Sequence, residues 1–311
     1  MNVTADVRYL SHLQFKQLDT RFDPENGAYW ALMQPRPRPC FSTQLLSELR
    51  AFIDGIVNSQ GRLDHKGEDC TVGYAILASK TPGVFNLGGD LALFRSAIDT
   101  GNRDALQHYA SQCIDDLHPW NRNFDLPITT ISLVQGDALG GGFEAALASS
   151  VLIAEESARM GFPEILFNMF PGMGAYSFLS RKVGRRVTEE LITSGAVYTA
   201  RQLFDMGVVD VIAPEGMGEP AVCSYIKKHA RAANGRRGLE AARREIEPIT
   251  REELDRVVGI WVDAAMKLTP RDLKMMERLV RAQQRNADED IVAAPDGESN
   301  VVRLEAVGAG D

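Results

Sequence analysis

Apolar residues recur along this chain at two spacings, which predict buried strands and amphipathic helices in alternation. The segment 28–33, Ala-Tyr-Trp-Ala-Leu-Met, is an apolar and aromatic run of the kind found in a buried strand. Behind Ser42, leucine, phenylalanine and isoleucine recur at three- and four-residue steps to about Asn58, which predicts a capped helix. Further strands are expected at 71–79, 84–90, 127–134 and 151–154, and helices at 91–117, broken near 99–102, and at 143–149. Strand, glycine-marked loop and helix thus alternate, which is typical of an α/β fold with parallel strands.

The chain becomes mainly helical from about Pro171. Thr250 and Glu253 have the spacing of a capping box, and the helix behind them repeats apolar residues on one face. We therefore expect a core with the functional site at 1–215, a C-terminal helical region at 216–286, and an acidic, flexible tail at 287–311.

Composition narrows the classes of function. The chain has 311 residues, 44% of them hydrophobic and 24% charged, which is ordinary for a globular protein. Its net charge of −8 argues against a nucleic-acid binder. It has no apolar run of membrane-span length and no signal-peptide layout, so we expect a cytoplasmic protein. Its 4 cysteines are widely spaced, which favours free thiols over disulfides or a zinc site.

Two glutamates and two groups of glycines carry the candidate chemistry. Glu144 follows the triple glycine 140–142, and Glu164 stands in the segment Gly-Phe-Pro-Glu-Ile, each with apolar neighbours that raise a carboxyl pKa. Glycine turns at 88–89 and 140–142 allow backbone amides to hold one carbonyl oxygen. Either glutamate alone is better explained as a cap or salt bridge; together with the glycines they indicate proton transfer without metal or cofactor. We expect the other acidic pairs, 155–156 and 189–190, at the solvated surface.

Several other chemistries lack their motifs. No Lys-Ser or Lys-Thr follows the glycines at 136–142, so this segment is not a P-loop. The segment 172–177 lacks the third glycine of a dinucleotide-binding fingerprint. The chain has no Gly-x-Ser-x-Gly elbow, and its 5 histidines have no ligand spacing.

These motifs resemble the crotonase (enoyl-CoA hydratase/isomerase) superfamily. The matching segments are 85–90, 135–144, 162–165 and 171–174, in the family's order and spacing. The resemblance implies a spiral of ββα units with a C-terminal helical trimerisation region. It also implies that the Gly89 and Gly141 amides form an oxyanion hole, that Glu144 and Glu164 are the acid/base pair, and that no cofactor is needed.

A narrower resemblance points to the diffusible signal factor synthases of bacterial quorum sensing. It rests on segments 85–94, 139–150, 162–177, 260–263 and 278–283. Asn168 and the pair Ala175-Tyr176 depart from an ordinary hydratase. We expect an acyl pocket lined by large apolar residues, against the simpler interpretation of core packing: Leu139, Phe167, Met169, Phe170, Met173, Tyr176 and Trp261.

The resemblance implies a lyase that dehydrates a 3-hydroxyacyl-carrier-protein thioester and then hydrolyses it, releasing a cis-2-unsaturated fatty acid. One alternative is an enoyl-CoA hydratase of fatty-acid breakdown. Another is a non-catalytic scaffold that binds a signalling kinase. The expected partners are acyl carrier protein or an acyl-CoA thioester, a sensor kinase as a further candidate, and copies of the chain in a homotrimer or hexamer. Basic residues at 181–186 and 227–231 are candidates for contact with acidic carrier protein, although each set also fits a solvated helix face.

Overall fold

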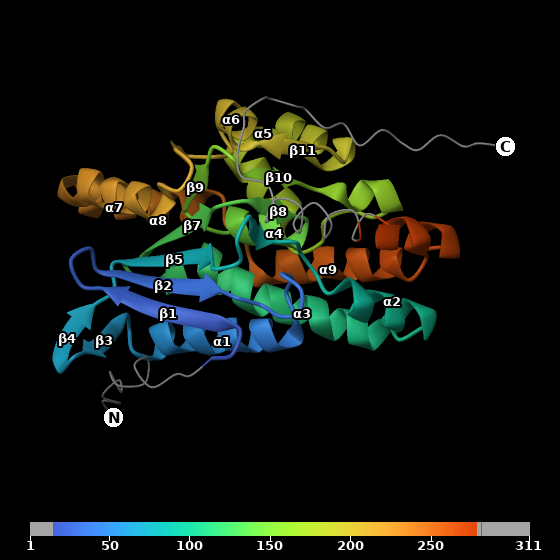
Figure 1. Cartoon of the computed structure of the whole chain (residues 1–311), viewed down its shortest axis with the longest axis horizontal. Helices are drawn as coiled ribbons and strands as arrows, with labels where there is room; N and C mark the ends of the chain where they lie inside the picture. The colour runs from blue at the N-terminus through green and yellow to red at the C-terminus, as the bar shows by residue number, and fades with distance from the viewer. Residues whose placement is uncertain (1–14, 279–280, 282–311) are drawn as a thin grey trace.

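The computed structural model describes residues 15–278 and 281. The expected tail at 287–311 lies outside the described residues. Helices pack on both faces of a larger sheet (Figure 1). A smaller sheet lies beside it, below the helices at 175–194 and 200–205 in this view. None of the helices within the described ranges combines the length and the apolar character needed to span a bilayer.

The larger sheet is parallel except at one edge. β1 is antiparallel to β2, and the remaining neighbours are parallel. Its order is β1 (Leu18–Asp23), β2 (Ala28–Met33), β5 (Tyr74–Ser79), β7 (Thr129–Val134), β9 (Val151–Glu155) and β12 (Val211–Ala213). Parallel sheets are covered on both faces, which explains why β2, β7 and β9 are buried at every residue.

The smaller sheet carries the glycine turns. Its order is β11 (Val197–Thr199), β10 (Arg159–Gly161), β8 (Asp137–Leu139) and β6 (Val84–Asn86). The strands β6, β8 and β10 are parallel, so their carboxyl ends lie at one edge. A separate hairpin pairs β3 (Arg62–His65) with β4 (Glu68–Thr71).

Alternate residues of β2 divide the core into two parts. Tyr29, Ala31 and Met33 belong to the cluster that also contains the apolar residues of α1, α3 and α9. Trp30 and Leu32 point the other way, into a cluster closed by α7. The helices concerned are α1 (Thr43–Asn58), α3 (Arg103–Asn121), α9 (Arg251–Ala265) and α7 (Gly218–His229). The other helical elements are α2 (Leu91–Asp99), η2 (Asn123–Asp125), α4 (Gly141–Leu147), η3 (Pro163–Phe167), α5 (Ala175–Ser194), α6 (Ala200–Asp205), η4 (Ala230–Ala232) and α8 (Ala233–Ile246).

The capping residues in the sequence predicted the ends of several helices correctly. Ser42 caps α1 by accepting a hydrogen bond from the Leu45 amide, and Thr250 caps α9 by accepting one from the Glu253 amide. The expected break near 99–102 is confirmed, because α2 ends at Asp99 and Asn102 caps α3. The α/β fold with C-terminal helices is confirmed.

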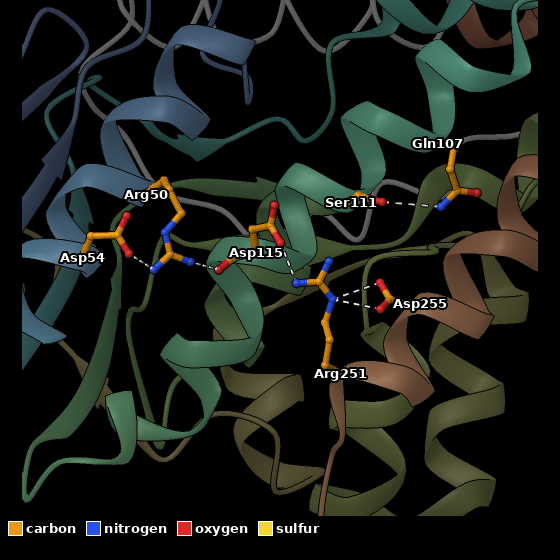
Figure 2. A network of polar contacts seen from close by, with 7 residues as sticks. All are labelled: Arg50, Asp54, Gln107, Ser111, Asp115, Arg251 and Asp255. Carbon is orange, nitrogen blue, oxygen red and sulfur yellow. Dashed lines mark hydrogen bonds and ion pairs between the residues drawn. The ribbon is translucent and has the colours of Figure 1, made fainter.

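Polar contacts on the outer side of α3 tie it to the helices on either side (Figure 2). Arg50 of α1 donates to the Asp115 carbonyl oxygen and pairs with Asp54. Arg251 of α9 pairs with the Asp115 carboxylate and with Asp255. These half-exposed pairs contribute little stability each, and they lie where the apolar cluster already packs α3 between α1 and α9.

Glu155 corrects the expectation of a solvated surface for the pair 155–156. The Glu155 side chain is 5% exposed and accepts hydrogen bonds from Gln135 Nε2 and from the Gly218 amide, both at 2.8 Å. A buried carboxylate needs hydrogen-bond donors, and the Glu155 donors come from two other segments of the chain, at Gln135 and Gly218.

Candidate active site

Two glycine turns meet at the carboxyl ends of neighbouring parallel strands. One follows β6 at Gly88 and Gly89, and the other joins β8 to α4 at Gly140 and Gly141. Gly88 has φ of +96°, and a Cβ built on it would lie 2.9 Å from the Leu139 carbonyl oxygen and 3.0 Å from the Gly141 amide nitrogen. The turns therefore touch backbone to backbone, and only glycine fits at position 88.

The Gly89 and Gly141 amides lie together at this contact. A Cβ on Gly141 would stand 3.5 Å from the Gly89 nitrogen. Gly141 is the first residue of α4, where an N–H has no carbonyl of its own helix to bond. The bridge between Phe41 and Gly89 runs from the Phe41 N–H to the Gly88 oxygen, at 2.8 Å, and does not use the Gly89 N–H. Within residues 15–278 and 281 neither amide has a hydrogen-bond acceptor, so both are available to an oxygen of a bound ligand.

Tyr109 of α3 fixes the first of these turns. Its buried hydroxyl donates to the Phe41 carbonyl oxygen at 2.6 Å and accepts from the Asp90 amide at 3.2 Å. Asp90 in turn caps α2 by accepting from the Ala92 and Leu93 amides. Gly89 is thus held on both sides, because Gly88 accepts a hydrogen bond from Phe41 and Asp90 caps α2.

Glu144 lies on α4 and is 1% exposed. Its Oε1 accepts hydrogen bonds from the Met173 amide at 2.8 Å and the Ala175 amide at 3.0 Å. Burial raises the pKa of this carboxyl to about 7, and the two amides oppose the rise because they favour the charged form.

Glu164 lies on η3, directly after β10, and its carboxyl group is turned against the second glycine turn. Its Oε1 is next to Gly140, and its Oε2 is out of contact with solvent and has no hydrogen-bond partner among residues 15–278 and 281. Burial raises the pKa of Glu164 to about 8, and the nearby Glu144 carboxyl adds to the rise.

The pair of glutamates is suited to moving protons near neutral pH. When two interacting carboxyls have pKa values raised to near neutral, one can be protonated and act as an acid while the other is ionised and acts as a base. Within the described residues, no group of three or more histidine, cysteine, aspartate or glutamate side chains is arranged to hold a metal ion.

A cavity of about 110 Å³ connects these groups with an apolar wall. Glu144, Glu164, Gly89 and Gly141 all line it. Four of the residues expected in an acyl pocket also line it: Phe167, Met169, Met173 and Trp261.

Leu139, Phe170 and Tyr176 do not line the cavity, which corrects their placement in the expected acyl wall. Leu139 ends β8 and is buried in the sheet, with its carbonyl oxygen against Gly88. Tyr176 is 41% exposed, because the first turn of α5 directs its hydroxyl toward Glu189, to which it donates at 3.1 Å.

Sequence reasoning missed a set of cavity residues on α3. They follow one helical face at steps of four, three and four: Tyr109, Cys113, Asp116 and Trp120. This spacing was the available signal, but it is equally typical of ordinary core packing.

A family model described as enoyl-CoA hydratase/isomerase matches residues 36–243. Among solved structures, human mitochondrial delta3-delta2-enoyl-CoA isomerase is similar with a TM-score of 0.69 and 18% identity, over 87% of this chain and 99% of that one. An enoyl-CoA hydratase/isomerase from Xanthobacter autotrophicus Py2 is similar with a TM-score of 0.66 and 19% identity, over 91% and 100%. Pseudomonas aeruginosa DspI is similar with a TM-score of 0.61 and 20% identity, over 88% and 99%. At these identities the likeness is one of fold.

Proposed function

Because the chain belongs to the enoyl-CoA hydratase/isomerase family, we propose that it dehydrates a 3-hydroxyacyl thioester and releases the product as a free 2-unsaturated fatty acid. The observation that carries this proposal is the meeting of two carboxyls and two amides at one apolar cavity, where Glu144 is buried and the Glu164 Oε2 is shielded from solvent. The largely apolar wall of the cavity suits an acyl chain, and the polar groups lie where its thioester end would react.

The first step uses all four groups. The thioester carbonyl oxygen binds between the Gly89 and Gly141 amides, which stabilise the enolate that forms when the α-proton leaves. Glu164 takes that proton, and Glu144 gives its proton to the departing 3-hydroxyl group, which leaves as water. The carbon–oxygen bond breaks, the double bond forms, and the pair ends with its proton exchanged from Glu144 to Glu164.

The raised pKa values of the two carboxyls are compatible with Glu144 as the acid and Glu164 as the base. Burial raises both pKa values to near neutral, about 7 for Glu144 and about 8 for Glu164, so one proton can reside on either carboxyl near neutral pH. Either carboxyl is therefore available as the acid at a small energetic cost, and dehydration begins from the placement on Glu144.

Release of the acid requires a second step at the same site. A water molecule that loses a proton to one carboxylate attacks the thioester carbonyl carbon, the amides stabilise the tetrahedral oxyanion, and the carbon–sulfur bond breaks. The thiol leaves with a proton from the other carboxyl. We propose acyl carrier protein as the thiol, and a cis-2-enoic acid of the diffusible signal factor type as the product.

A second candidate is hydration of an enoyl-CoA. The placement of the proton on Glu164 is the starting state for hydration, with Glu144 free to deprotonate water. The family model also carries this description. A hydratase gives a 3-hydroxyacyl-CoA and no free acid, so the products separate the two candidates.

We further propose that the protein assembles as a homotrimer or hexamer through its C-terminal helices. Leu239 and Ile246 of α8 and Ile260 of α9 are exposed apolar residues on these helices. A partner surface would remove them from water.

A scaffold that only binds a signalling kinase requires no active carboxyls, and loss of both glutamates would leave its binding unchanged.

The test is a product analysis by mass spectrometry with matched 3-hydroxyacyl-carrier-protein, 3-hydroxyacyl-CoA and enoyl-CoA substrates. We expect free 2-enoic acid from the wild type and a loss of roughly 10²–10⁴-fold in Glu144→Ala and Glu164→Ala. Glu190→Ala, which removes an exposed glutamate, is the matched control. Full activity in both cavity variants would refute the proposal.

A further inference from the structure

Asp116 is a buried carboxyl group in the wall of the apolar cavity. It lies on α3, is 6% exposed, and lines the same cavity as Glu144 and Glu164. Neither of its carboxyl oxygens has a hydrogen-bond partner among the described residues. Buried polar groups without partners are rare in folded proteins, so this group calls for a ligand or a function.

The nearby basic residue does not provide the missing partner. Arg50 is close enough to act electrostatically on Asp116, but its hydrogen bonds go to the Asp115 carbonyl oxygen and to Asp54 (Figure 2). Asp115, the neighbouring residue, pairs with Arg251 on the outer side of α3. On α3, therefore, Asp115 contributes to contacts between helices, whereas Asp116 lines the cavity.

The surroundings of Asp116 favour the neutral form of its carboxyl group. Burial raises the pKa of Asp116 well above its usual range, against the opposing influence of Arg50. The other cavity residues contributed by α1 and α3 are almost all apolar: Leu46, Leu49, Ile53, Cys113, Leu117 and Trp120. A neutral carboxyl offers an O–H donor and a carbonyl acceptor, so it matches a hydroxyl group better than a methylene.

Asp116 lies away from the Gly89 end of the proposed oxyanion hole along α3. Tyr109, seven residues earlier, bonds to the segment beside Gly89, and seven residues of helix span about 10 Å along the axis. A group that meets Asp116 is therefore on the body of the acyl chain, beyond the carbons at which the double bond forms.

We infer that the acyl chain accepted by this cavity carries a hydroxyl group on its distal part, which hydrogen-bonds to Asp116. This inference rests on the proposed function for the nature of the chain, but not for the contact itself. Asp116 acts as a specificity residue, because an unsubstituted chain leaves its carboxyl desolvated and unpaired, and such sites reject the analogue that lacks the polar group.

The test is a binding measurement that needs no turnover. Isothermal titration calorimetry of the full chain compares one medium-length saturated fatty acid with its isomers hydroxylated at successive carbons toward the methyl end. We expect one isomer, or two adjacent ones, to bind about tenfold tighter than the unsubstituted acid. In Asp116→Leu the unsubstituted acid should bind tighter, and the hydroxyl preference should disappear.

Two further variants separate the contact from structural effects. Asp116→Asn keeps the shape and hydrogen-bonding capacity, so part of the hydroxyl preference should remain. Asp115→Asn, the matched control outside the cavity wall, should keep the whole preference. Equal binding of all isomers to the wild type, no binding at all, or an unchanged preference in Asp116→Leu would overturn the inference. Failure of the dehydratase assay alone would count against the proposed function and not against this contact.

Discussion

Glu164 occupies the space that a side chain on Gly140 would fill. A Cβ built on Gly140 would approach the Glu164 Oε1 more closely than real Cβ atoms approach any neighbour. The glycine at this position therefore does more than permit the turn at φ of +52°. It makes room for one of the two carboxyls of the proposed acid/base pair.

We predict that Gly140→Ala displaces the Glu164 carboxyl and lowers kcat by about 10²-fold, since a misplaced catalytic group loses its alignment. Gly83→Ala is the matched control, because Gly83 has φ of +66° but nothing within 4 Å of its added Cβ. Both variants carry backbone strain on the order of 1 kcal/mol, visible as a lower melting temperature. Equal kcat losses in the two would contradict a steric effect on Glu164.

The pH dependence of kcat should be a narrow bell. Proton transfer needs one carboxyl protonated and one ionised, and the two pKa values lie at about 7 and about 8. We expect kcat to fall below about pH 7, where both carboxyls are protonated, and above about pH 8, where both are ionised. A flat profile between about pH 5 and about pH 10 would show that neither carboxyl titrates in the reaction.

The free energy of unfolding should fall as pH rises, because burial raises the pKa values of the same two carboxyls in the folded state. The folded pKa of Glu164 is raised from 4.5 to about 8, so between these values the native state holds a proton that the unfolded chain has released. Its contribution to stability is fully present below about pH 4.5 and is lost as pH rises through about 8. Glu164→Gln cannot ionise, so it should be more stable than the wild type by an amount that grows with pH.

At about pH 8 this gain should be on the order of a few kcal/mol, given roughly 1.4 kcal/mol per pKa unit. Urea unfolding at a series of pH values measures it. Glu190→Gln, at an exposed position, should show no such trend. A gain in Glu164→Gln that is constant with pH would point to packing and not to ionisation.

Trp261 should determine which acyl chains fit. Its ring lies in the cavity wall, against Gly172 and edge-on to Phe94, with ring centroids 5.1 Å apart. We predict that Trp261→Ala costs about 3–5 kcal/mol of stability and moves the substrate preference toward longer or bulkier chains. Tyr176→Ala removes an exposed ring outside the cavity, so it should change stability by about 0.5 kcal/mol or less and leave the preference unchanged. Competition between thioesters of graded chain length measures both.

Features set by local interactions were readable from the sequence. The helix behind Ser42 and the strand at 28–33 were placed at their observed limits, because a side-chain cap and a run of buried residues act over a few neighbours. The strand expected at 71–79 was less well placed. Its first residue, Thr71, pairs with Arg62 in the β3–β4 hairpin, and β5 begins only at Tyr74, since the partner of a strand is decided by distant residues.

The sequence by itself singled out the two glutamates and the two glycine turns as candidate site residues, because their combination and spacing are distinctive. Only the tertiary structure decided what surrounds them. It placed Tyr176 in solvent and Asp116 in the cavity, although Tyr176 stands next to a recognised motif and Asp116 looked like any polar residue of a helix. The physical reason is that the direction of a helical side chain depends on where the whole helix packs. For α3 that packing is fixed by contacts with α1 and α9, far away in the chain.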